Sequence, residues 1–135
     1  MSHSVSSDQD IFSSLPDLLE DQHNIEIMTV TDGPDAMFLI LRNMQTDKRY
    51  RLDVDAIQYY QVTMNEAYYA YRWQTDAIMP QCCFYSIENS RLVDWLVKVS
   101  GGILDDINKI RHLVIITCER SADLVFYGEF RITPI

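Results

Sequence analysis

Glycine and proline are scarce in this chain of 135 residues, which contains four of each. The four glycines form no glycine-rich loop between a strand and a helix, and no serine stands in a Gly-x-Ser-x-Gly nucleophile elbow. These absences argue against the common nucleotide-dependent enzymes and hydrolases. They do not exclude an enzyme built on other residues, but they favour a protein without catalytic activity.

Long apolar runs are also missing, and none approaches the roughly 20 residues needed to cross a bilayer. The first ten residues, MSHSVSSDQD, lack the basic start and the apolar core of a signal peptide. We therefore expect a cytoplasmic protein that makes no membrane contact. No linker divides the chain, so residues 1–135 are interpreted as one domain, with residues 1–10 frayed.

Cysteine is limited to Cys82, Cys83 and Cys118, an odd number with two neighbours, which does not describe a disulfide framework. Zinc sites favour ligand pairs separated by two to four residues, and these cysteines, His23 and His112 do not follow that spacing. We expect reduced thiols, no metal and no cofactor. A cysteine nucleophile activated by His112 is the sharpest enzymatic alternative, although nothing in the sequence brings these residues together.

Basic residues are outnumbered, because 11 lysines and arginines stand against 20 aspartates and glutamates, for a formal net charge of −9. Residues 1–67 hold 12 of the acids and 4 of the bases, a net charge of −8 (4 minus 12). An acidic surface repels phosphate backbones, so we expect no binding of nucleic acid. A basic protein partner would be attracted.

An antiparallel meander is predicted over residues 25–30, 36–42 and 49–55, in which 36–42 is apolar on both faces like a central strand and 49–55 alternates. Strands at 57–62, 68–73 and 83–87 follow. A C-terminal hairpin is predicted from residues 112–118 and a single return strand at 124–133. A short helix is predicted over residues 14–22, where Ser14 is a candidate cap and Pro16 suits the first turn. A second helix begins at Ser90.

The apolar residues of the second predicted helix recur at the spacing i, i+3, i+4 and i+7, which places them on one face. They are Leu92, Trp95, Leu96 and Val99. We expect this face to pack on a sheet and Trp95 to belong to the core. The predicted fold class is α+β, a mainly antiparallel twisted sheet with one main helix packed on a face.

Aromatic residues gather in one stretch, which is the most unusual feature of the sequence. Alternate residues of a two-stranded ribbon face opposite sides, so a single core does not cover every ring. Tyrosine and tryptophan are enriched at protein interfaces, whereas the plain alternative is aromatic pairing within a sheet. The candidate contact residues are Tyr59, Tyr60, Tyr68, Tyr69, Tyr71 and Trp73.

Asp53 and Asp55 lie on the solvent-exposed face of one predicted strand. A carboxylate pair in such a position can bind a basic group, hold a cation or transfer protons. Arg49 and Arg51 alternate with them and can neutralise them. Asp53 and Asp55 are therefore candidate partner-binding residues, and a cleft beside them or beside His112 is the alternative site of a small enzyme or ligand-binding domain.

Four short segments, Asp53-Val54, Glu66, Ser90 to Trp95 and His112 to Thr117, follow one another in an order that resembles small bacterial immunity-type α+β proteins. The resemblance covers roughly residues 49–132 and its motifs are mostly structural. It implies a protein that binds and blocks a toxin, often a basic nuclease, through an acidic surface. It implies no catalytic residues.

The sequence is compatible with three functions. The leading hypothesis is a non-enzymatic protein-binding module, an inhibitor or immunity-like protein that acts on a basic partner. The second is the small enzyme or ligand-binding domain described above. The third is a homo-oligomer of structural role, for example a homodimer with tyrosines at its interface.

Overall fold

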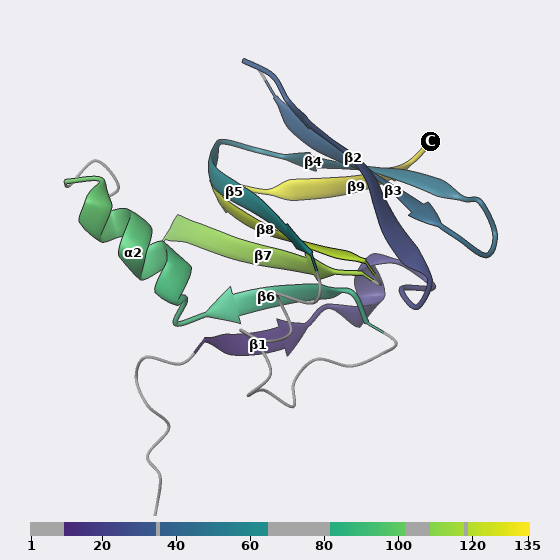
Figure 1. The fold of residues 1–135 in the computed structure, drawn as a ribbon, viewed down its shortest axis with the longest axis horizontal. Coiled ribbons are helices and arrows are strands. Elements are labelled where there is room, and N and C mark those ends of the chain that lie inside the picture. Colours follow the sequence, from purple (N-terminus) through teal and green to yellow (C-terminus); the bar gives the residue numbers. More distant parts are fainter. Residues whose placement is uncertain (1–9, 35, 65–81, 102–108, 118) are drawn as a thin grey trace, which may run out of the picture.

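The computed structural model describes residues 10–34, 36–64, 82–101, 109–117 and 119–135. Within these ranges the chain forms nine β-strands, one 3₁₀ turn and one α-helix (Figure 1). In chain order they are β1 (Ile11–Ser14), η1 (Pro16–Leu18), β2 (Ile25–Asp32), β3 (Met37–Asn43), β4 (Arg49–Val54), β5 (Ile57–Met64), β6 (Phe84–Glu88), α2 (Arg91–Val99), β7 (Ile110–Ile116), β8 (Arg120–Tyr127) and β9 (Phe130–Pro134).

The strands form two antiparallel sheets. One has four strands in the order β2-β3-β4-β9, and the other has five in the order β1-β6-β7-β8-β5. The predicted meander of residues 25–55 is confirmed as β2, β3 and β4, since each strand pairs with the next. The five-stranded sheet combines strands that are distant in the sequence, such as β5 with β8.

One hydrophobic core joins the two sheets. In β3, Met37, Leu39 and Leu41 alternate with partly exposed residues and are buried, as period-two patterning requires. They belong to the same buried cluster as Leu113 of β7 and Leu124 of β8, which lie in the other sheet. The facing sides of the two sheets therefore bury a single shared interior.

The chain crosses between the sheets after β1, after β4 and after β8, and the last two crossings are hydrogen-bonded to each other. The chain leaves the four-stranded sheet after β4 at Asp55 and Ala56, and it returns to that sheet before β9 at Gly128 and Glu129. The Asp55 amide donates to the Glu129 carbonyl at 3.0 Å, and the Tyr127 amide donates to the Ala56 carbonyl at 3.2 Å. We call this arrangement the paired corner.

The expected α+β class is wrong, because the described chain is mostly antiparallel sheet with one helix of nine residues. The helix does begin where predicted, and the Ser90 hydroxyl caps it by accepting from the Val93 amide at 3.1 Å. However, α2 lies at the end of the five-stranded sheet instead of covering a sheet face (Figure 1). Local periodicity predicted the helix correctly but could not place it.

The predicted packing face of α2 is also wrong. Trp95 is 51% exposed and Val99 is 59% exposed, while Val93, outside the predicted face, is 5% exposed. Leu92 and Leu96 are half-buried. An amphipathic pattern identifies the apolar side of a helix, but whether a sheet covers that side depends on where the helix lies.

The helix predicted over residues 14–22 is wrong as well. Ser14 lies in β1 and pairs with Tyr85 of β6, and only Pro16–Leu18 forms a 3₁₀ turn. The following segment is fixed by the buried side chain of Gln22. Its amide nitrogen donates to the Leu15 carbonyl at 2.7 Å, and its oxygen accepts the Cys83 amide at 3.0 Å. Ser14 therefore pairs with a distant strand and does not cap the helix that the local sequence pattern predicted.

The predicted return strand at 124–133 is divided in two by the paired corner. Its N-terminal part belongs to β8 in the five-stranded sheet, and its C-terminal part is β9 in the four-stranded sheet. The strands predicted at 57–62 and 83–87 are confirmed as β5 and β6. The strand predicted at 68–73 and nearly all of residues 1–10, which were predicted to be frayed, lie outside the described residues.

Gly128 should be required at the paired corner, because its φ is +89° and an added Cβ would lie 3.3 Å from Cβ of Asp55. We expect Gly128→Ala to lower the free energy of unfolding by about 2–3 kcal/mol, since strain and crowding add. Gly101→Ala is the matched control, since its φ is +63° with nothing within 4 Å. It should cost about 1–2 kcal/mol. If urea denaturation shows equal losses of unfolding free energy for the two variants, the close contact with Asp55 is unimportant.

Candidate functional site

A buried chain of hydrogen bonds joins α2 to the five-stranded sheet. The Ser90 hydroxyl lies 2.7 Å from Nδ1 of His112, and Nε2 of His112 lies 2.7 Å from a carboxylate oxygen of Asp123. Gln61 of β5 donates to the other oxygen of Asp123 at 3.2 Å. These residues come from β5, β7, β8 and the start of α2, so only the folded sheet brings them together.

Ser90, His112 and Asp123 are the residue types of a hydrolase triad, but here they bond to one another in the interior of the protein. The side chains of His112 and Asp123 are both 0% exposed. A neutral imidazole satisfies the chain when Nε2 donates to Asp123 and Nδ1 accepts the Ser90 hydroxyl hydrogen. The Ser90 oxygen meanwhile accepts the Val93 amide of α2. The network therefore anchors the helix to the sheet and offers no nucleophile to a substrate.

The hypothesis of a cysteine nucleophile beside His112 is wrong for the described cysteines, because the ring nitrogens of His112 bond to Ser90 and Asp123. Cys82 and Cys83 are buried free thiols. Burial, together with the neighbouring Cys82, raises the pKa of the Cys83 thiol far above its ordinary value. That thiol stays protonated near neutral pH and is a poor nucleophile. Cys118 lies outside the described residues.

Asp53 and Asp55 do share a pocket, of about 370 Å³, at the end of the four-stranded sheet next to the paired corner. Each is paired with an arginine, since Arg51 lies 3.0 Å from Asp53 and Arg131 lies 3.3 Å from Asp55. Asp55 also accepts the amide of Glu129 at 3.4 Å, which assigns it to the corner. The pair is thus largely neutralised and partly structural, and it does not form a free acidic site.

The predicted tyrosine ribbon is represented among the described residues by Tyr59 and Tyr60. Tyr60 is partly buried and packs against the shared core. The Tyr59 ring lies edge-on to the ring of Trp95, with centroids 5.9 Å apart. The remaining candidates, Tyr68, Tyr69, Tyr71 and Trp73, lie outside the described residues. Sequence reasoning placed Trp95 in the core and therefore missed it as a surface residue.

Trp95, Val99 and Tyr59 form one exposed apolar surface at the junction of α2 and β5, which we call the α2 surface. Trp95 and Val99 are each more than half exposed, and Tyr59 is half-buried. Asp94 and Lys98, both exposed on the same helix, add one charge of each sign. The combination is an aromatic patch flanked by an acidic and a basic side chain.

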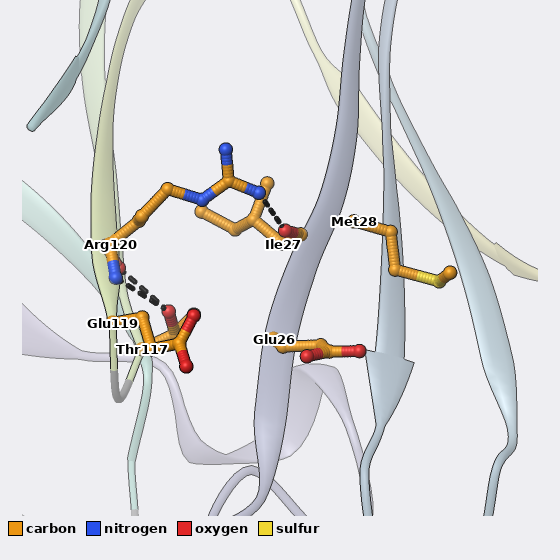
Figure 2. A pocket seen from close by; sticks show the side chains of 6 residues that line it. All are labelled: Glu26, Ile27, Met28, Thr117, Glu119 and Arg120. Atoms are coloured by element: carbon orange, nitrogen blue, oxygen red, sulfur yellow. Dashed lines mark hydrogen bonds between the residues drawn. The ribbon is translucent and has the colours of Figure 1, made fainter. Parts of the chain in front are cut away.

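A pocket of about 290 Å³ lies where β2 faces the start of β8 (Figure 2). The Arg120 guanidinium reaches across it and donates to the Ile27 carbonyl, so it links the two sheets. In Figure 2 the Glu26 side chain extends away from Arg120, and no ring of carboxylates converges on the space. Among the described residues, no group of three or more histidines, cysteines or acids is placed to hold a metal ion.

Comparisons with known proteins give no match, whether by family models, among curated proteins or among solved structures. In the described part of the chain, no helix combines the length and the apolar character that a membrane span requires.

Asp123→Ala should leave the donors of His112 and Gln61 without their buried acceptor. We expect the free energy of unfolding to fall by about 3–5 kcal/mol. Asp53→Ala is the control, because its ion pair with Arg51 is partly exposed and should contribute less than about 1 kcal/mol. Urea denaturation measures both effects.

The closed network can also be tested chemically. A fluorophosphonate reagent, which labels activated serines, should not modify Ser90 in the native protein, because the hydroxyl is buried and caps α2. Mass spectrometry would detect the adduct. Stoichiometric labelling of Ser90 would contradict the structural role and indicate an accessible nucleophile.

Proposed function

We propose that this protein is a non-enzymatic protein-binding module whose partner contacts the α2 surface. The observation that supports this most strongly is Trp95, which is half exposed on the helix and edge-on to Tyr59. A tryptophan held in place by a neighbouring ring presents a large apolar area at little further entropic cost. Such residues dominate binding energies at protein interfaces.

The position of α2 favours a contact that the helix makes as a rigid unit. Its N-terminus is fixed through Ser90 to His112 and Asp123, and Val93 is buried beneath it. The exposed residues Trp95 and Val99 therefore lie on an anchored helix. A preorganised surface loses less entropy on association than a surface that orders only when it binds.

The charge of the chain favours a basic partner. The formal net charge of the chain is −9, whereas on α2 itself the exposed Asp94 is balanced by the exposed Lys98. Opposite charge accelerates encounter and suppresses wrong partners, and both effects weaken as salt increases. An immunity-like inhibitor of a basic toxin is one form of this function, and the sequence resemblance to such proteins supports it. The buried thiols Cys82 and Cys83 suit the reducing cytoplasm that we propose as its location.

Affinity capture from a lysate of the native host tests this function, with the wild-type protein and Trp95→Ala as baits. Trp95→Ala should keep the fold, because a half-exposed side chain contributes little to the core. If Trp95 contributes about 2 kcal/mol to binding, capture should weaken roughly 30-fold. The captured protein should be basic. Raising the salt concentration to roughly 0.5 M should reduce its capture, because salt screens the attraction between opposite charges.

Met44→Ala is the matched control, since Met44 is 42% exposed but lies on the four-stranded sheet side, after β3. It should capture the same partner as the wild type. Equal capture by Trp95→Ala and Met44→Ala would contradict the proposed contact. Sedimentation that shows a dimer lost only in Trp95→Ala would contradict the basic partner and make a second copy the occupant.

A further inference from the structure

An apolar cavity of about 280 Å³ lies on the inner face of the five-stranded sheet, on the side that faces the core. Its volume is slightly below the usual range of ligand pockets, which measure roughly 300–1,000 Å³. It shares no lining residue with the α2 surface or with the pocket of Asp53 and Asp55. The residues that line it are Leu15, Leu18, Ser86, Arg111, His112, Leu113, Phe126 and Phe130.

The cavity has an apolar end and a cationic end. Leu15 and Leu18 flank it at the η1 turn, where the Leu15 amide bonds to the Phe84 carbonyl. Phe84 pairs with Ile115 on β7, and Arg111 lies four residues back along the same strand. At about 3.3 Å per residue, the two ends are roughly 13 Å apart, which accommodates an extended chain of about eight carbons.

Arg111 is fixed at its end of the cavity but keeps donors available. Its guanidinium carbon lies 5.4 Å from the ring centroid of Phe126 and 5.3 Å from that of Phe130. One terminal nitrogen, Nη1, donates to the Gly128 carbonyl and to Glu129, each at 3.0 Å. Among the described residues, Nε and Nη2 make no hydrogen bond. That edge of the guanidinium can bind a carboxylate with two parallel bonds.

Two other groups define the chemistry. Ser86 lies opposite Leu113 in the β6–β7 pairing, and it lines the cavity with a hydroxyl that can donate to an anion. Glu129 opposes an anion, but its side chain is 77% exposed and is not a lining residue. The His112 side chain is not available, because it is committed to Ser90 and Asp123.

We propose that this cavity binds a medium-chain monocarboxylate, with the carboxylate on Arg111 and the hydrocarbon chain directed toward Leu15 and Leu18. Charge complementarity selects the head group, since Arg111 is the cation that lines the cavity. The leucine and phenylalanine lining selects an apolar chain. A small-molecule site goes beyond the protein-binding role, and it does not depend on that role.

Titration with octanoate tests the site, with calorimetry for affinity and NMR of the leucine methyl groups for location. Octanoate should bind saturably with one molecule per chain, and octanol, which lacks the charge, should bind at least tenfold more weakly. Arg111→Gln should weaken octanoate binding about tenfold or more, because the bidentate ion pair is lost. Glu129→Gln should strengthen it severalfold, because a repelling charge is removed.

Arg49→Gln is the matched control, since Arg49 is a similarly exposed arginine of β4 outside the cavity. It should leave octanoate affinity unchanged. Leu18→Trp should fill the cavity and abolish binding, and the fold of each variant is checked by its thermal transition. The proposal is overturned if octanoate does not bind saturably up to its solubility limit. It is equally overturned if Arg111→Gln and Arg49→Gln bind octanoate alike.

Discussion

The paired corner is the constraint on which the two-sheet arrangement depends. Strands β4 and β9 pair in one sheet, β5 and β8 pair in the other, and both ribbons are continuous in the chain through Asp55–Ala56 and Gly128–Glu129. A single antiparallel ribbon thus folds over the core and contributes to both sheets. Because the two bends bond to each other, their backbone groups stay satisfied where the ladders are interrupted.

Buried polar groups connect the remaining parts to this ribbon. Gln22 bonds the segment after η1 to the start of β6, and the chain from Ser90 to Asp123 bonds α2 to β8. Each of these polar side chains would be costly in the interior without partners. Their pairing therefore specifies one position for η1 and one for α2. The first position places Leu15 and Leu18 in the lining of the apolar cavity, and the second leaves Trp95 at the surface.

The two proposed sites differ in what creates them. The α2 surface exists because an amphipathic helix extends from the end of a sheet, so its apolar side has no sheet beneath it. The cavity lies between η1 and the paired corner, with Leu18 among its lining residues at one end and Phe130 at the other. One suits a macromolecular partner, and the other suits a small apolar anion.

The sequence by itself determined part of the local structure. The apolar run at residues 36–42 and the cap at Ser90 were sufficient for β3 and for the start of α2, because both signals act between near neighbours. Only the tertiary structure decided the fold class, the exposure of Trp95 and the partners of His112. These features depend on pairings such as β7 with β8, across which His112 meets Asp123. Local patterns carry no information about such register, since it is set by the burial of a shared core.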